Sequence, residues 1–336
     1  MTENNRLTTL GEFGLIEYIQ SQVDPSPFLR LGIGDDCSIQ TVGSDEELLT
    51  STDLLIEGVH FNLDWTNFEQ LGRKSVAVNV SDIAAMGGTP RSLYLGLAFP
   101  ATLSLEHLEQ FLGGVLSKTK DYGAVLAGGD TCRSTGPLII SVTVQGAAKS
   151  GQAICRSGAQ PGDLIYVSGT LGDSALVLHS LQNNEQPASE LAERHHCPEA
   201  RTELGRSLAD QGLANAMIDI SDGLVADLNH ILKASDKGAV LSLEHIPLSA
   251  TFQQACQEQS GLIDLALTWG EDYELLFTAS PAAEKEIVLL SEKLKLSLSK
   301  IGSVNDGNGL NILQKDGALY QYRQAGFDHF ASEAKE

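Results

Sequence analysis

One helix-type segment limits what this chain can fold into more than any other stretch of its sequence. Residues 74–86 are rich in small residues, with Val and Ile among them, and two glycines followed by Pro90 end the pattern. Three polar residues recur at helical spacing and so share one face: Ser75, Asn79 and Asp82. Met86 continues the same row. A carboxylate on so apolar a helix is costly to bury alone. The pattern therefore predicts a metal ion or a hydrogen-bond partner for Asp82.

Strand-type segments alternate with helical ones along the chain. Apolar and β-branched residues predict strands at 47–51 and 138–144, and a turn-rich entry leads into another strand at 164–168. This alternation predicts a fold of the α/β class, in which the sheets are mixed as in α+β proteins. A chain of 336 residues is long enough for two domains, which we place at residues 1–149 and 150–336. The polar stretch at 183–197 is predicted to be a surface excursion.

The charge of the chain argues against several classes of partner. Asp and Glu total 44 against 22 Lys and Arg, which gives a formal net charge of −22. Nucleic acids are held mainly by Lys and Arg, so a DNA or RNA partner is not expected. No apolar run reaches the roughly 18–20 residues that span a membrane. Five scattered cysteines without a CxxC pair indicate reduced thiols. We expect a cytoplasmic protein with no membrane partner.

Six short acidic clusters lie on separate segments, each beside glycine or a hydroxyl residue. They are Gly34-Asp35-Asp36, Ser51-Thr52-Asp53, Asn79-Val80-Ser81-Asp82, Gly128-Gly129-Asp130-Thr131, Asp219-Ile220-Ser221-Asp222-Gly223 and Gly270-Glu271-Asp272-Tyr273-Glu274. Carboxylate, hydroxyl and carbonyl oxygens are hard ligands that suit Mg²⁺, and Mg²⁺ suits phosphate. The sequence has no GxxxxGK[ST] loop and no complete dinucleotide-binding glycine pattern. The clusters predict a phosphate site that holds several metal ions.

Each cluster also has a purely structural interpretation, because an Asp beside a glycine is usually a turn residue. The open alternatives are a strand-end turn at Gly128-Gly129-Asp130, a helix cap at Ser221 or Asp222, strand-edge charges at Glu271 and Asp272, and an ion pair between Arg156 and Asp163. His60 and Phe327, taken alone, are as readily ordinary packed residues.

The clusters, in this order, resemble those of the thiamine-monophosphate kinase family, within the aminoimidazole-ribonucleotide-synthetase-like superfamily of ATP-dependent enzymes. The resemblance runs from Gly11-Glu12-Phe13 to Gly326-Phe327-Asp328-His329-Phe330. Its most diagnostic runs are Leu31-Gly32-Ile33-Gly34-Asp35-Asp36-Cys37, Ser51-Thr52-Asp53, Gly58-Val59-His60-Phe61, residues 77–87, residues 218–224 and residues 270–275. As a set these runs are highly specific, although any one of them would also fit sibling enzymes.

The resemblance implies an activity and an architecture. The activity is transfer of the γ-phosphoryl group of ATP to thiamine monophosphate, which gives thiamine diphosphate and ADP in thiamine biosynthesis. The implied fold has two α/β domains of the aminoimidazole-ribonucleotide-synthetase-like type. Residues 1–149 would bind ATP and metal and, through their sheet, form a homodimer. The implied cofactors are several Mg²⁺ ions, with ATP as co-substrate.

The resemblance also implies roles for individual residues. The metal ligands would be Asp36, Ser51, Thr52, Asp53, Asp82, Asp130, Asp219 and Asp222. Nucleotide contacts would come from Gly129, Asp130, Arg156 and Ser221, and substrate contacts from His60, Glu271 and Phe327. Because the acceptor phosphate is already anionic, no general base is expected, and Asp82 and Asp219 would be essential through the metal.

Two other functions stay open at this point. One is a sibling synthetase of the selenophosphate or aminoimidazole ribonucleotide type, although no reactive cysteine lies in a glycine-rich loop near the N-terminus. The other is a Mg-nucleotide sensor without catalysis. A sensor need not keep every acidic cluster, so the complete set favours an enzyme.

Overall fold

The chain forms two compact units, which are described separately. The computed structural model describes residues 18–31, 39–40, 42–259 and 261–322. The first unit comprises residues 1–153 and 196–202, and the second comprises residues 154–195 and 203–336. Residues 196–202 thus belong with the first unit, although they follow the predicted boundary near residue 150. Within the described ranges, no helix has both the length and the apolar character needed to cross a membrane.

The first unit is built on a four-stranded mixed sheet. Its strands are β3 (Glu46–Ile56), β4 (Thr89–Pro100), β5 (Val125–Ser134) and β6 (Ile139–Lys149). They lie in the order β3-β6-β4-β5, with β4 and β5 parallel and the other pairs antiparallel. Two short strands, β1 (Leu29–Leu31) and β2 (Ile39–Gln40), form a separate antiparallel pair.

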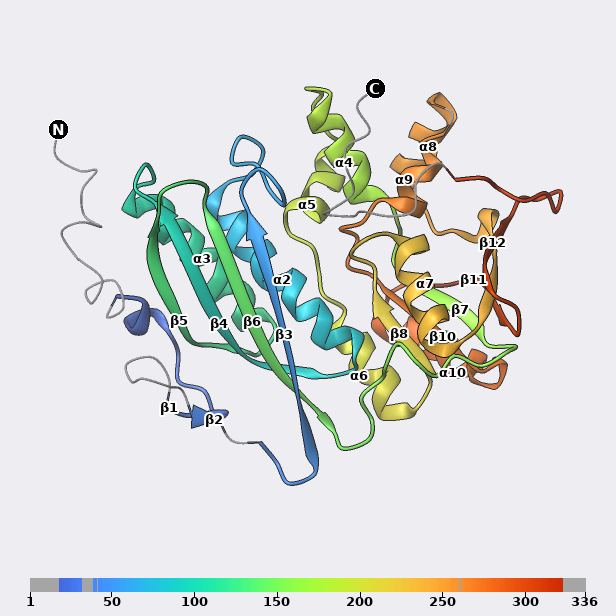
Figure 1. The fold of residues 1–336 in the computed structure, drawn as a ribbon, viewed down its shortest axis with the longest axis horizontal. Helices are drawn as coiled ribbons and strands as arrows, with labels where there is room; N and C mark the ends of the chain where they lie inside the picture. Colours follow the sequence, from blue (N-terminus) through green and yellow to red (C-terminus); the bar gives the residue numbers. More distant parts are fainter. Residues whose placement is uncertain (1–17, 32–38, 41, 260, 323–336) are drawn as a thin grey trace. The chain divides into compact units, whose positions relative to one another are not determined.

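Two helices, α2 (Phe68–Ala85) and α3 (Leu105–Asp121), lie side by side on one face of this sheet (Figure 1). On β3, Leu49 and Leu55 are buried, whereas Leu48 and Leu54 are 45% and 55% exposed. Because side chains alternate along a strand, odd-numbered β3 residues face the helices and even-numbered ones face away. The face opposite the helices therefore presents apolar side chains that its own unit leaves exposed.

The predicted helix at 74–86 is confirmed, but α2 begins earlier. Its start is a capping box, in which Asn67 Oδ1 accepts from the Gln70 N–H at 2.8 Å and Gln70 Oε1 accepts from the Asn67 N–H at 3.3 Å. Its end comes at Gly87, whose φ of +72° favours glycine. Between these ends almost every residue is buried, which explains why its polar side chains need partners.

The second unit has a six-stranded sheet in the order β12-β9-β11-β7-β10-β8. Its strands are β7 (Leu164–Ser168), β8 (Ala216–Asp219), β9 (Gly238–Ser242), β10 (Leu275–Ala279), β11 (Leu298–Asn305) and β12 (Gly309–Leu313). All neighbours are antiparallel except β9 and β12. The predicted strands at 47–51, 138–144 and 164–168 all correspond to observed ones.

Helices surround this second sheet and supply much of its core. They are α4 (Asp173–Gln182), α5 (Ser189–His196), α6 (Thr202–Gln211), α7 (Leu224–Ser235), α8 (Ala250–Glu258), α9 (Ile263–Thr268) and α10 (Glu284–Leu294), with short 3₁₀ turns at Leu243–His245 and Pro281–Ala283. Fully buried Leu228, Ile231 and Phe252 belong to this core. Burying each such side chain stabilises the fold by about 1.5–3 kcal/mol.

The prediction of a surface excursion at 183–197 is wrong for its second half. Residues 189–196 form α5, and His195 and His196 are only 8% and 9% exposed. The polar sequence of α5 is explained by ion pairs and hydrogen bonds to buried groups, which let a polar helix pack against the interior.

Candidate functional site

In the first unit, α2 and β3 bring together three of the predicted metal ligands. The Ser51 hydroxyl donates to Asp82 Oδ2 at 2.5 Å, and Asp53 lies close enough to Asp82 to interact with its charge. The pKa of Asp53 is raised to about 6, first because surrounding atoms shield its carboxyl from water and second because Asp82 is nearby. A divalent cation would oppose this rise, so the donor set of two carboxylates and a hydroxyl fits a hard metal ion.

Thr52 lies on the other face of the same strand. Its hydroxyl shares a 2.9 Å hydrogen bond with Thr143 of β6, whereas Ser51 points toward α2. The alternation of a strand therefore separates the Thr52 hydroxyl from the cluster of Ser51, Asp53 and Asp82. This side-chain geometry does not support a metal role for the Thr52 hydroxyl, which stays a prediction.

Gly129 and Asp130 lie within β5, so a strand-end turn at this position is wrong. Asp53 on β3 is in register with Val142, then Leu95, then Gly129 across the sheet. Two strands therefore lie between Asp53 and Gly129, a separation of about 14 Å at the usual strand spacing. Strand packing alone explains the glycine, because a Cβ at position 129 would lie 2.1 Å from the Leu95 carbonyl oxygen.

His60 lies in the turn that follows β3. Its Nδ1 accepts a hydrogen bond from the Ile56 N–H at 3.1 Å, which fixes the ring against the strand end. An accepting Nδ1 places the ring proton on Nε2, a donor suited to an anionic ligand. The local fold thus gives His60 a defined orientation, while its predicted substrate contact stays a prediction.

In the second unit, three loops meet at one end of the sheet. Strand β7 ends at Ser168, β8 ends at Asp219, and β10 begins at Leu275. The register pairs Leu275 with Asp219 on one side, and the Ser168 hydroxyl accepts from the Leu275 N–H at 2.9 Å on the other. Residues 169–172, 220–223 and 270–274 therefore lie beside one another.

The loop at 220–223 is shaped by Asp227, which is not among the predicted site residues. Asp227 Oδ2 accepts from the N–H groups of Ser221, Asp222 and Gly223, each at 3.1 Å. The alternative of a helix cap at Ser221 or Asp222 is wrong: Gly223 is the N-cap of α7, with φ of +115° and no side-chain cap. The carboxylate of the first helical turn instead satisfies the free N–H groups.

The carboxylates of this loop crowd one another. Burial raises the pKa of Asp227 to about 8, and the charges of Asp219 and then Asp222 add to the rise, while hydrogen bonds from Asp222 and Gly223 oppose it. Asp222, Asp227 and the exposed His230 each place one ligand atom within 4.8 Å of the others. Asp219, only 4% exposed, lies beside them. The carboxylate oxygens of this loop fit a hard metal ion, whereas the imidazole of His230 does not.

The loop at 270–274 is tied to the loop at 220–223 and holds an unusual backbone. Glu271 N–H donates to the Ser221 carbonyl and Tyr273 N–H to the Ile220 carbonyl, both at 2.9 Å. Glu271 and Tyr273 have φ of +68° and +50°, which non-glycine residues rarely adopt. Such backbone costs on the order of 1–3 kcal/mol per residue and marks functional loops.

Asp272 is buried, so a plain strand-edge charge at this position is wrong. Both its oxygens accept from the Gly172 N–H at 3.0 Å. Burial raises the pKa of the Asp272 carboxyl well above its ordinary value, although the Gly172 hydrogen bond and Arg194 act against the rise; Asp173 and Glu274 add to it. Asp272 therefore fixes the loop from inside, while Glu271 keeps a partly exposed carboxylate.

The remaining predicted residues are placed as follows. Arg156 is exposed, and Asp163 accepts instead from Asn215 Nδ2 at 2.9 Å and from the Gln160 N–H at 2.9 Å. Asp36 and Phe327 lie outside the described residues. Asp227 and Arg194 are the polar residues that sequence reasoning missed. An acidic residue in the first turn after an Asp-Gly loop was the one available signal for Asp227.

Comparison with known proteins agrees with this architecture. The chain matches AIR synthase related protein, N-terminal domain, over residues 34–148 and AIR synthase related protein, C-terminal domain, over residues 160–315. It is 38% identical over 329 residues to the thiamine-monophosphate kinase of Haemophilus influenzae, a match that covers 96% of this chain and 98% of that relative.

Solved structures are similar over the same extent. The thiamine-monophosphate kinase of Stenotrophomonas maltophilia superposes with a TM-score of 0.82 at 37% identity and covers 91% of this chain and 96% of its own. AaThiL complexed with AMPPCP and TMP gives a TM-score of 0.74 at 33% identity, over 97% of this chain and 99% of that one. With both domain matches and near-complete coverage of its relatives, the chain belongs to the thiamine-monophosphate kinase family of AIR synthase related proteins.

Proposed function

We propose that this chain transfers the γ-phosphoryl group of ATP to thiamine monophosphate (TMP), forming thiamine diphosphate and ADP. The near full-length match to thiamine-monophosphate kinases is the observation that carries this proposal. A relative of similar fold binds TMP together with AMPPCP, an analogue of ATP, so both proposed substrates have a counterpart in the family.

The proposed reaction is a direct transfer. An oxygen of the TMP phosphate forms a bond to the γ-phosphorus, and the bond from that phosphorus to the β–γ bridging oxygen breaks, so ADP leaves with the electron pair. The attacking oxygen is already anionic, so no side chain has to remove a proton. The barrier is mainly the approach of two anions, which positioning and opposite charge lower.

The acidic clusters have the composition that this chemistry needs. Ser51, Asp53 and Asp82 in the first unit, and Asp219 and Asp222 in the second, would hold Mg²⁺, as would Asp36 and Asp130. Bound Mg²⁺ supplies the positive charge that phosphates require, which a chain with a net charge of −22 lacks. Gly129, Arg156 and Ser221 would contact the nucleotide, and His60, Glu271 and Phe327 the TMP.

Turnover by the purified full-length protein tests the proposal. ATP and Mg²⁺ are supplied with and without TMP, and thiamine diphosphate is followed by chromatography. We expect thiamine diphosphate and ADP in equal amounts, and ADP formation that depends on TMP. Binding of Mg·ATP without any product would contradict the proposal and favour a sibling synthetase or a nucleotide sensor.

Direct transfer has its own test. If an Asp were phosphorylated first, γ-labelled ATP followed by an acid quench would leave label on the protein. We expect no label on the protein during turnover. A labelled aspartate that forms and decays at the rate of turnover would replace direct transfer by a two-step route.

We also propose that the chain is a homodimer that pairs through the sheet of its first unit. Leu48 and Leu54 are exposed on the face of that sheet opposite α2 and α3, as apolar residues at an interface would be in an isolated chain. A second copy that covers this face would remove both from water.

Leu54→Asp is expected to convert the dimer to a monomer, because it would bury a charge without a partner in the pairing face. Sedimentation of the wild-type protein should give twice the mass of the chain, and the variant the mass of one chain. Val288→Asp is the matched control: Val288 is similarly exposed, at 52%, but lies on α10. A monomeric wild type, or a dimeric Leu54→Asp, would contradict this interface.

A further inference from the structure

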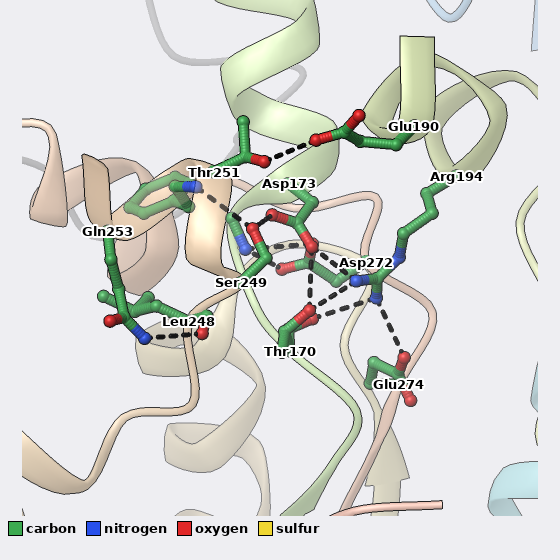
Figure 2. A network of polar contacts seen from close by, with 12 residues as sticks. Thr170, Asp173, Glu190, Arg194, Leu248, Ser249, Thr251, Gln253, Asp272 and Glu274 are labelled. Atoms are coloured by element: carbon green, nitrogen blue, oxygen red, sulfur yellow. Dashed lines mark hydrogen bonds and ion pairs between the residues drawn. The ribbon is translucent and has the colours of Figure 1, made fainter. Parts of the chain in front are cut away.

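A single arginine on α5 connects two of the three loops at the end of the second sheet. Arg194 Nη1 pairs with Asp173 Oδ2 and donates to Thr170 Oγ1, and its Nη2 donates to the Thr170 carbonyl at 3.1 Å and pairs with Glu274 Oε1 at 3.1 Å. Figure 2 shows the guanidinium between Thr170 and Asp173 on one side and Glu274 on the other. The planar fork of arginine suits contacts in several directions at once.

The two carboxylates of this cluster are held at both oxygens. Asp173 Oδ1 accepts from the Ser249 hydroxyl at 2.6 Å, and Glu274 Oε2 accepts from the Ser168 hydroxyl at 2.5 Å. The side chains of Asp173 and Glu274 are each 1% exposed. Buried charges with every oxygen occupied have little freedom to move, so the cluster defines the position of the loop that contains Glu274.

That loop carries Glu271, the predicted TMP contact. Glu274 is three residues from Glu271, and between them the left-handed backbone at Glu271 and Tyr273 persists only if its surroundings hold it. The hydrogen bonds to the loop at 220–223 hold one side, and the ion pair of Arg194 with Glu274 holds the other.

The next residue of α5 faces the Glu271 side chain itself. His195 Nδ1 lies 2.8 Å from the Ser174 hydroxyl and 3.8 Å from Glu271 Oε2, and His195 is only 8% exposed. Two consecutive residues of α5 thus contact the loop at 270–274. Arg194 pairs with the buried Glu274 at its end, and His195 lies beside the partly exposed carboxylate of Glu271.

We propose that Arg194 and His195 are positioning residues for TMP recognition, Arg194 by fixing the backbone of residues 271–274 and His195 by orienting the Glu271 carboxylate. This inference rests on the proposed function. The Ser221 N–H, on the adjoining loop, donates to Asp227 at 3.1 Å, a contact in which α5 takes no part. Loss of the α5 contacts should therefore affect TMP more than ATP.

Arg194→Lys keeps the positive charge but replaces the planar guanidinium, whose two Nη groups contact different partners, by a single ammonium group. We expect it to raise KM for TMP at least about tenfold and to lower kcat/KM for TMP about 100-fold, because hydrogen bonds between charged groups are lost. KM for ATP should change less than about threefold, since Ser221 keeps its own support. Arg91→Lys is the control, because Arg91 also forms an ion pair with a carboxylate, that of Glu46, but lies on β4 of the first unit. His195→Gln places its amide near the position of Nε2, so it removes the Nδ1 contacts to Ser174 and Glu271 while the ion pairs of Arg194 stay intact. This variant should show the same selective rise in KM for TMP.

Hydrogen exchange of the full-length protein gives a readout that does not need activity. The Glu271 and Tyr273 N–H groups are hydrogen-bonded, so peptides that span them should be protected in the wild type. Arg194→Lys should speed their exchange about tenfold or more, and Arg91→Lys should not. Unchanged exchange, or equal changes in KM for both substrates, would overturn the proposal. A wild type with no TMP-dependent turnover but the same exchange response would refute the proposed function and leave the positioning of this loop by Arg194 supported.

Discussion

Asp82→Asn is expected to lower turnover at least about 100-fold, the size of effect seen when one charge-stabilising group is removed from an active site. The change removes one negative charge at nearly constant volume from the cluster of Ser51, Asp53 and Asp82. The fold should be retained, because the amide oxygen of Asn can still accept the hydrogen bond that Ser51 donates to Asp82 at 2.5 Å. The expected defect is therefore chemical.

The measurement is kcat at saturating TMP over a range of Mg²⁺ concentrations, together with a thermal melt. Asp121→Asn is the matched control: it makes the same change on α3 at a side chain that is 52% exposed and lies 3.7 Å from Arg73. Asp219→Asn should reproduce the loss in the second unit. Near-normal turnover of Asp82→Asn and Asp219→Asn at saturating Mg²⁺ would show that the reaction does not use these clusters.

The sequence predicted those elements whose pattern reflects local burial. The helix at 74–86 and the strand Leu164–Ser168 were identified because apolar spacing and helix- or turn-forming residues act over a few positions. Asp82 was correctly predicted to need a partner, since a carboxylate on an apolar helix needs one wherever it packs. Ser51, its observed partner, is 31 residues away.

The sequence could not show contacts that depend on register or on distant partners. Whether Thr52 faces Asp82 depends on the alternation of β3, which is fixed only when the strand packs against α2. Likewise, the polar sequence of α5 is typical of a surface loop, and only its distant partners show that it packs as a helix. Arg194 meets Glu274, 80 residues later, and no local pattern indicates that meeting.

Gly114→Ala is expected to destabilise the first unit by about 3 kcal/mol, the upper part of the usual range for overpacking a close contact. A Cβ at Gly114 would lie 2.1 Å from the Glu69 carbonyl oxygen, and one at Gly72 would lie 2.1 Å from the Phe111 carbonyl oxygen. Both obstacles are helix backbone, which cannot rotate away. The two helices can cross this closely only because each has glycine at the crossing point.

Gly113→Ala is the matched control in the same helix. A Cβ there meets nothing within 4 Å, so the substitution should be neutral or stabilise the unit by about 0.5–1 kcal/mol through helix propensity. The chain has two tryptophans, Trp65 and Trp269, one in each unit. In a Trp269→Phe background, fluorescence during urea unfolding reports on the first unit through Trp65.

The same substitution should also disturb the candidate site in the first unit. Helix α2 contains both Gly72, at the crossing with α3, and Asp82, at the contact with β3. If alanine at position 114 moves α2 away from α3, the hydrogen bond between Ser51 and Asp82 must lengthen or α2 must bend. Gly114→Ala should therefore lose activity at temperatures below its own melting transition, whereas Gly113→Ala should not. A Gly114→Ala protein as stable as Gly113→Ala would mean that the helices do not cross as closely as the glycines indicate.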